Sequence, residues 1–271
     1  MNRRTKLHTY TLALCLLAAP AAARAAAPSG AQEKTNAPQA AAAAQPGTPT
    51  EVARAFYTAL REGRFRDALW MSVYRPAIEG LSTADLEDLR VDFARLAAQV
   101  PKDFDFTGEQ LSGEEATVFM RTGQDRDVKV EPVYLIRGPG GAWIIGDRES
   151  AAEVKKLGKK FFFEQRIAAH ESEVEDMLKR IQAAQLAYSL QHAGAFTDLG
   201  TLVKAGYVPQ DILGTETTGY SFTVITDGKS YAARAEPARY GHTGRLSFYM
   251  DANGVQKKDA GGKPLAPSKS K

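Results

Sequence analysis

The longest helical pattern of the chain lies in residues 151–192, where apolar positions recur every three or four residues. The apolar stripe consists of Val174, Met177, Leu178, Ile181, Ala184 or Gln185, and Tyr188. The positions between them are polar, so such a helix needs a surface that buries its stripe. We expect the helix to run from about Gln165 to His192 and to pack on a small sheet that contains Tyr220 and Phe248.

Three shorter helices are predicted ahead of it. The first follows Thr50, which can cap it, and ends at Gly63. The second covers residues 64–73. The third begins at Ser82, because Ser82 and Asp85 have the spacing of a capping box ahead of an apolar stripe.

After residue 100 the apolar period changes from helical to two, which indicates strands. Four strands are predicted in the first half, in residues 103–111, 114–121, 128–138 and 142–147. Pro132 indicates a bulge or a sheet edge in the third of them. Three more are predicted in the second half, in residues 219–226, 230–237 and 245–251, with a tight hairpin at Asp227-Gly228.

This order of elements predicts an α+β protein of two domains. We assign residues 49–150 to a domain of helices and a curved antiparallel sheet. Residues 151–257 form the second domain, a long helix on a small antiparallel meander, with Gly158 as an expected break in the helix. The Ala/Pro-rich residues 26–48 and the basic residues 258–271 lack apolar periodicity, so we expect a disordered linker and a disordered tail.

Residues 1–25 have the three parts of a secretory signal peptide. A basic start is followed by a short apolar core in residues 9–17 and by the cleavage pattern Ala23-Arg24-Ala25. The predicted location is therefore periplasmic or secreted, after cleavage near Ala25. The apolar core is too short to span a bilayer, and no later segment is long enough. Cys15, the only cysteine, follows Leu14 rather than a small residue, which disfavours lipid attachment.

The net charge of the mature chain is close to zero. The formal charge of +3 includes four basic residues of the signal peptide, and without them 31 basic residues stand against 32 acidic ones. A general affinity for nucleic acid or for an anionic membrane is therefore not indicated.

Two segments of the first domain resemble the nuclear-transport-factor-like (ketosteroid-isomerase-like, cystatin-like) superfamily. They are residues 50–73, TEVARAFYTALREGRFRDALWMSV, and residues 133–147, VYLIRGPGGAWIIGD. The resemblance implies a curved sheet wrapped on helices to form a cone, in a superfamily of enzymes, ligand binders and scaffolds. In such a cone a ligand pocket would be lined by Tyr57, Trp70, Tyr74 and Tyr134. Isomerase-like chemistry would also need a carboxylate in the pocket, and Asp67 and Asp92 lie on predicted helices.

The second domain, over residues 165–257, resembles the soluble head of type IV pilin-like and type II secretion pseudopilin-like proteins. The resemblance rests on an ordered set after the long helix: Gly206-Tyr207, Gly219-Tyr220-Ser221-Phe222, Tyr231, Ala233, Pro237, Gly244-Arg245, Phe248, Asp251 and Gly254-Val255. It implies a long helix on an antiparallel meander and an envelope context. The apolar membrane stem of a true pilin is missing, so the usual insertion into a pilus is not implied.

The candidate chemical residues favour structural roles. His170, His192 and His242 show no metal-protease spacing, and Ser268 and Lys271 match S-x-x-K only within the tail. Glu171, Glu173, Glu175 and Asp176 are expected to form a solvated helix face. The turn formed by Asp251, Asn253 and Gly254 is typical of a hairpin rather than a calcium loop.

These observations predict an exported cell-envelope protein that is not an enzyme and has no catalytic residues, metal or cofactor. Its expected role is a protein-interaction or assembly module whose partners are envelope proteins. The alternative is binding of a small apolar ligand, or isomerase-like chemistry, in the cone of the first domain.

Overall fold

The computed structural model describes residues 47–123, 127–216 and 218–266. The predicted signal peptide, nearly all of the predicted linker and the last five residues lie outside these ranges. The chain forms two compact units that divide between Lys159 and Lys160. The division falls nine residues after the predicted boundary at 150, because the helix that follows the first sheet packs back on the N-terminal unit.

The N-terminal unit begins with five helices before its sheet. They are α1 (Pro49–Arg61), α2 (Phe65–Trp70), α3 (Arg75–Glu79), α4 (Thr83–Asp88) and α5 (Arg90–Ala98). The cap of α1 is Thr48, not Thr50, because Thr48 and Glu51 form a capping box with Pro49 at the first helical position. The predicted capping box of Ser82 and Asp85 is confirmed at α4.

Two features of these helices were not predicted. The predicted third helix is divided at Leu89, which ends α4 and precedes α5. The short helix α3 was missed, because Pro76 and the five-residue length leave no helical stripe to read.

A four-stranded antiparallel sheet completes the N-terminal unit, with α6 (Arg148–Leu157) after it. Its strands are β1 (Phe104–Ser112), β2 (Glu115–Thr122), β3 (Lys129–Arg137) and β4 (Trp143–Ile145), in that order. Pro132 pairs with Phe119 of β2, whereas β4 pairs only with residues 135–137 of β3. The proline therefore lies on a locally open edge, as predicted, where its missing N–H leaves no ladder bond unmade.

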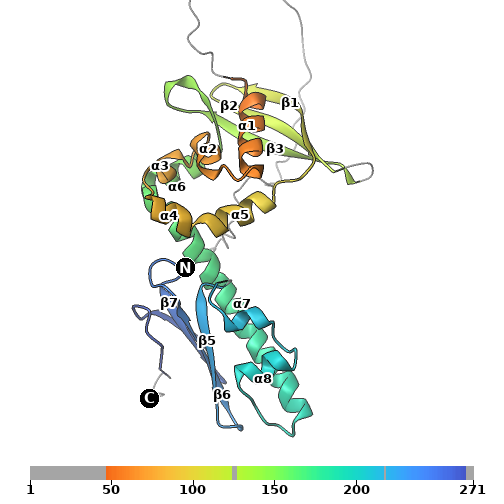
Figure 1. Ribbon diagram of the computed structural model, residues 1–271, viewed down its shortest axis with the longest axis vertical. Helices are drawn as coiled ribbons and strands as arrows, with labels where there is room; N and C mark the ends of the chain where they lie inside the picture. Colours follow the sequence, from red (N-terminus) through yellow and green to blue (C-terminus); the bar gives the residue numbers. More distant parts are fainter. Residues whose placement is uncertain (1–46, 124–126, 217, 267–271) are drawn as a thin grey trace, which may run out of the picture. The chain divides into compact units, whose positions relative to one another are not determined.

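Helix α1 lies across this sheet (Figure 1). Its buried side chains pack on the inward-facing side chains of the strands. The core of the unit consists of Ala53, Phe56, Tyr57, Ala59, Leu60, Ala68, Phe106, Ala116, Val118, Met120, Val133, Leu135, Trp143 and Ile145. The same side chains thus fill the space between the helix and the sheet.

The C-terminal unit is organised on α7 (Phe161–Gln191), 31 residues long. The predicted break at Gly158 is confirmed, since its φ of 52° ends α6 and a 3₁₀ turn (Gly158–Lys160) precedes α7. The helix begins four residues before the predicted Gln165, because Phe161 and Phe162 are already buried. Beyond it lie α8 (Leu199–Lys204) and the 3₁₀ turn η4 (Gln210–Leu213).

The second sheet has four antiparallel strands rather than the three predicted. They are β5 (Tyr220–Thr226), β6 (Tyr231–Pro237), β7 (Leu246–Asp251) and β8 (Gly254–Asp259), paired in sequence order. Lys258 and Asp259 therefore belong to the sheet and not to the predicted tail. The β5–β6 connection is a loop of four residues, closed by Asp227, whose carboxylate accepts bonds from the N–H groups of Lys229 and Ser230.

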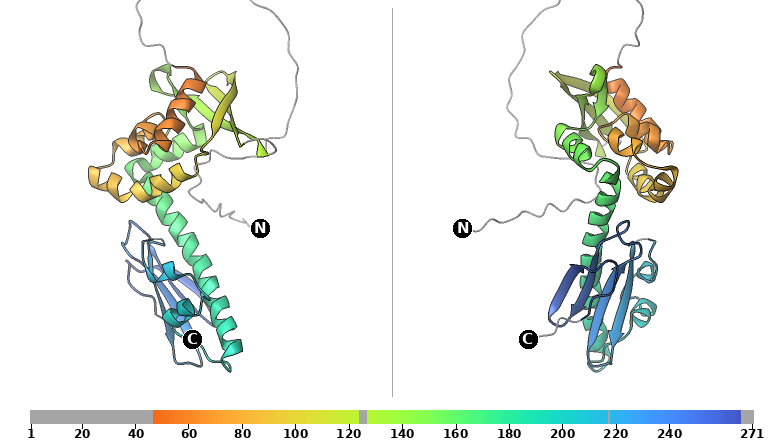
Figure 2. Two further views of the ribbon diagram at one scale, coloured as in Figure 1. Left: turned by 45° about the vertical axis from the view of Figure 1, so that its right-hand side comes forward. Right: turned by 90° about the vertical axis from the view of Figure 1, so that its left-hand side faces the viewer.

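The predicted packing of α7 is confirmed. Val174, Leu178 and Ile181 are fully buried in one cluster with Tyr220 and Phe248 of the sheet. Figure 2 shows α7 running alongside the sheet in both views. In the described part of the chain, no helix is long and apolar enough to cross a membrane.

Candidate functional site

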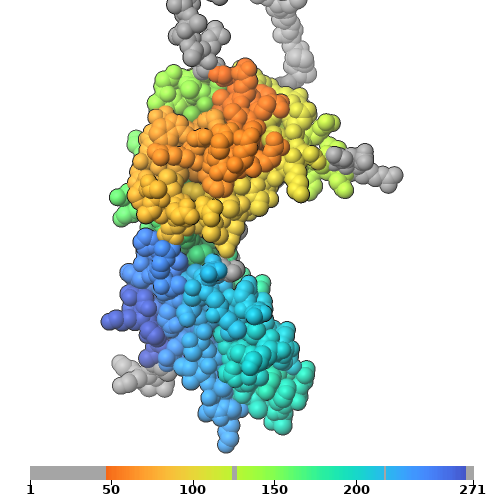
Figure 3. Space-filling view, in the orientation of Figure 1, coloured from red at the N-terminus to blue at the C-terminus, as the bar shows by residue number. Residues whose placement is uncertain are grey.

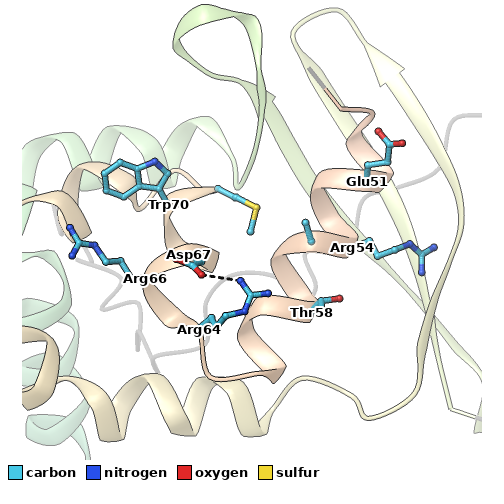
Figure 4. Close-up of a pocket in the computed structure, with 9 residues that line it drawn as sticks. Glu51, Arg54, Thr58, Arg64, Arg66, Asp67 and Trp70 are labelled. Atoms are coloured by element: carbon cyan, nitrogen blue, oxygen red, sulfur yellow. Dashed lines mark hydrogen bonds and ion pairs between the residues drawn. The ribbon is translucent and has the colours of Figure 1, made fainter. Parts of the chain in front are cut away.

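A groove on the surface of the N-terminal unit lies between α1 and α2. Its volume is about 780 Å³, and it is lined by Glu51, Arg54, Ala55, Thr58, Arg64, Arg66, Asp67, Trp70 and Met71. Figure 4 shows Arg66 and Trp70 on α2 at one end of the groove and Arg54 on α1 at the other. In the space-filling view, α1 and α2 (orange) lie at the surface, so the groove is accessible (Figure 3).

The turn between the two helices sets the shape of the groove. Gly63 adopts a φ of 73°, and the N–H of Arg64 donates to the carbonyl of Ala59. Ala59 and Ala68 are fully buried in the same cluster, and their small side chains allow the helices to approach closely. The outward-facing side chains of both helices then form the walls.

The acidic side chains of the groove are already held by groups of the same chain. Asp67 pairs with Arg64 at 2.9 Å, and Arg64 also pairs with Glu62 at 2.8 Å. Glu51 accepts the N–H of Thr48 at 2.8 Å as part of the capping box. The charges of both carboxylates are therefore compensated locally.

Two arginines of the groove are less engaged. Arg54 lies 3.6 Å from Asp105, a loose ion pair in which both side chains are more than half exposed. Arg66 has no carboxylate within ion-pair distance among the described residues, and its guanidinium carbon lies 6.0 Å from the Trp70 ring centroid. The uncompensated charge of the groove is thus positive.

Trp70 is the large apolar side chain of the groove and is 37% exposed. The guanidinium carbon of Arg75 lies 4.5 Å from its ring centroid, and Arg75 is itself held by Glu79 at 2.8 Å. A guanidinium over an indole face is a favourable cation–π arrangement. It fixes the orientation of the ring and leaves part of the ring open to a ligand.

The four residues predicted to line a cone occupy different places. Tyr57 is 3% exposed in the core, where burial raises the pKa of its hydroxyl, and Tyr74 is 6% exposed. Tyr134 lines a separate hollow of about 220 Å³, which also contains Glu115 and Arg148. Only Trp70 contributes to the groove between α1 and α2.

The arginines of the groove are not among the site residues predicted from the sequence. The signal that could have found them is the run Arg64-Phe65-Arg66 shortly before Trp70, an interleaving of basic and aromatic residues. Of the two acids considered for isomerase-like chemistry, Asp67 is exposed at the surface and paired with Arg64, whereas Asp92 is half-buried on α5.

The candidate chemical residues of the C-terminal unit have structural contacts. Nδ1 of buried His170 lies 2.9 Å from the carbonyl oxygen of Thr243. The ring of His192 stacks on Tyr188 with centroids 3.8 Å apart, and the ring of His242 meets Phe163 edge-on.

The acidic positions of α7 divide into exposed and anchoring residues. Glu171 accepts the N–H groups of Arg245 and Leu246, and Glu175 pairs with Lys257 of β8, so these two bind the sheet. Asp251 closes the β7–β8 hairpin by accepting the N–H of Asn253. Over the described residues, no three His, Cys, Asp or Glu side chains gather in a way that would hold a metal ion.

Comparison of the chain with protein-family models, with curated proteins and with solved structures finds no match.

Proposed function

We propose that this protein is exported to the cell envelope and acts there by binding other proteins, through the groove between α1 and α2. The observation that carries the proposal is the exposed ring of Trp70 beside Arg66 and Arg75. Tryptophan and arginine are the residues that most often dominate the binding energy of protein interfaces. An aromatic ring held in position also loses little conformational entropy on binding.

We further propose that the C-terminal unit is a pilin-like head without a membrane stem. Support comes from the stripe of α7, which packs on an antiparallel meander in the order implied by the resemblance. Glu171 accepts the N–H of Leu246 on β7 and Glu175 pairs with Lys257 on β8, so both residues anchor the helix to the sheet. In this proposal the head contributes to an envelope assembly, and the N-terminal unit recruits the partner.

The alternative, an apolar ligand in the cone of the first domain, has less support. The inner face of the sheet is occupied by side chains of the protein, including Phe106, Met120 and Trp143, which are buried against α1. A ligand there would have to displace packed core side chains, at a cost of about 1–3 kcal/mol or more.

Export is tested by the N-terminus of the protein recovered from cells. Mass spectrometry of the envelope and secreted fractions should find a chain that begins near Ala26. A chain that keeps residues 1–25 in the cytoplasmic fraction would contradict the localisation.

Protein binding is tested by site-specific photocrosslinking in intact cells. A photoreactive amino acid at Thr58, inside the groove, should give discrete crosslinks to one or a few proteins. The matched control places it at Arg90, an exposed position on α5 outside the groove lining. Equal crosslinking at both positions, or none at Thr58, would contradict the proposed function.

A further inference from the structure

The charges and shape of the groove also indicate the chemistry of its partner, an inference that rests on the proposed function. Of the five charged side chains that line it, Arg64 and Asp67 neutralise each other and Glu51 is held by the helix cap. Among the described residues, Arg66 has only its contact with Trp70, whereas Arg54 has a loose pair with Asp105 and lies 5.3 Å from the Phe106 ring centroid, so neither is held by a close carboxylate. A ligand therefore meets two cationic groups, one at each end of the groove (Figure 4).

The lining of the groove also includes apolar side chains. They are Ala55, Trp70 and Met71, and the side chain of Met71 is half-buried. A thioether and an indole adapt well to an inserted aromatic or aliphatic side chain. Burial of one such side chain favours binding, because it removes apolar surface from water.

We propose that the groove binds a protein segment in which an apolar side chain and a carboxylate lie on the same side. The apolar side chain covers Trp70 and Met71, and the carboxylate pairs with Arg66. A second carboxylate of the segment can pair with Arg54 at the other end.

The spacing of the two ligand groups follows from the structure. The guanidinium carbon of Arg66 lies 6.0 Å from the centroid of the Trp70 ring. In an extended segment, residues two apart lie on the same side about 6.6 Å from each other. On a helix, residues three or four apart lie about 5–6 Å from each other on the same face. Residues next to each other in an extended segment point to opposite sides and do not fit.

A nucleic acid is the less favoured ligand for this groove. An aromatic ring beside arginines can also stack a base and bind phosphate. However, a continuous phosphate backbone favours a row of cations, whereas the two less engaged arginines are separated by the Arg64–Asp67 ion pair. A protein segment can place its carboxylates at the two arginines alone.

The test measures binding of labelled peptides of about 12 residues to the full-length protein by fluorescence anisotropy. Two acidic probes carry Phe and Glu two or four positions apart, and matched peptides replace Glu by Lys or Phe by Ser. At least one acidic probe should bind, with Kd in the range of about 10–500 μM expected for a short flexible segment. Both replacements should weaken that binding by about tenfold or more, equivalent to about 1.4 kcal/mol.

Variants of the groove provide the second arm of the test. Arg66→Glu and Trp70→Ala should each weaken binding of the acidic probe by about tenfold or more, because each removes one of the two contacts. Arg66→Lys should retain part of the affinity, since the charge remains but the two-pronged geometry is lost. The control Arg90→Glu reverses an exposed charge outside the groove and should leave the affinity unchanged. Far-ultraviolet circular dichroism confirms that each variant is folded.

The inference is overturned if no acidic probe binds at about 1 mM, or if the lysine peptides bind equally well. It is also overturned if Arg66→Glu has no effect, or if single-stranded oligonucleotides bind where the acidic peptides do not. Crosslinks at Thr58 that persist in the Arg66→Glu variant would agree with the proposed function but contradict the partner chemistry inferred for the groove. Absence of crosslinks would remove the proposed function itself.

Discussion

The guanidinium group of Arg245 meets the carboxylate of Glu164 in a two-pronged ion pair, with N–O distances of 2.7 and 2.6 Å. The two residues are 81 positions apart and join the first turn of α7 to the residue that immediately precedes β7. The Glu164 side chain is 26% exposed, so the pair is only partly screened by water. Hydrogen bonding to Arg245 lowers the pKa of Glu164, although partial burial opposes this effect.

This pair predicts a pH dependence of the C-terminal unit. Because the pKa of Glu164 is lower in the folded protein, the pair stabilises the unit above the unfolded pKa of about 4.3. That contribution disappears as the pH falls through the lower, folded pKa. Glu164→Gln should therefore reduce the free energy of unfolding by about 1 kcal/mol at pH 7. The difference from the unaltered protein should disappear in strong acid, as measured by chemical denaturation at several pH values.

The control for this experiment is Glu173→Gln on the same helix. Glu173 is exposed and has no ion pair among the described residues, so its replacement should have little effect at any pH. An equal loss of stability in both variants, or a Glu164→Gln effect that persists unchanged in acid, would contradict the role of the pair.

The cap of α1 gives a prediction for the N-terminal unit. Thr48→Ala removes the side-chain oxygen that accepts the N–H of Glu51, and should cost about 1 kcal/mol. Thr48→Ser keeps the oxygen and should restore most of the stability. Both tryptophans of the chain, Trp70 and Trp143, belong to this unit, so tryptophan fluorescence reports its unfolding selectively. Equal losses in the Ala and Ser variants would show that the cap is not the source of the effect.

Patterns that depend on neighbouring residues were readable from the sequence, and those that depend on distant ones were not. The stripe from Val174 to Tyr188 and the capping box at Ser82 are local, and both were predicted. The cap at Thr48 was assigned to Thr50 because both are threonines next to Pro49. Only Thr48 lies three residues before Glu51, which is the spacing of a capping box, and this spacing identifies it as the cap.

The fourth strand of the second sheet was missed for a different reason. β8 lies at the edge of the sheet, and its residues Gln256, Lys257 and Lys258 show no apolar alternation. Charged edge strands of this kind are common because they discourage pairing with other chains. The strand is specified by its hairpin with β7 and not by its own pattern.

The candidate site was the least predictable part. Tyr57 and Trp70 are aromatic residues on neighbouring helices, yet one is 3% exposed and the other 37%. Helical spacing alone does not separate a core position from a groove position. The charge balance of the groove depends on which acids pair with which arginines, and this requires the turn at Gly63 to be known.

Gly244 predicts a severe loss of stability on enlargement. A Cβ added at Gly244 would overlap the ring and hydroxyl of Tyr220, which is fully buried and donates to the carbonyl of Leu246 at 2.9 Å. Gly244→Ala should therefore destabilise the C-terminal unit by about 1–3 kcal/mol or more. Gly214→Ala is the matched control in the same unit, because a Cβ there meets only an ordinary contact with the carbonyl of Asp211. Hydrogen exchange of the β5 and β7 amides would measure the stability of the C-terminal unit in both variants. Similar protection in the two variants would contradict the prediction.

The two leucines Leu178 and Leu190 test the orientation of α7 with the same chemical change on the same helix. Leu178 is fully buried in the cluster with the sheet, whereas Leu190 is 80% exposed. Leu178→Ala should lower the free energy of unfolding by about 2–5 kcal/mol, because it removes buried methyl groups and leaves a cavity. Leu190→Ala should change it by less than about 0.5 kcal/mol. Chemical denaturation followed by far-ultraviolet circular dichroism measures both changes, and tryptophan fluorescence should remain unaltered because it reports the other unit. A loss at Leu190 as large as that at Leu178 would mean that the exposed end of α7 is covered in solution, and the packing described for this helix would need revision.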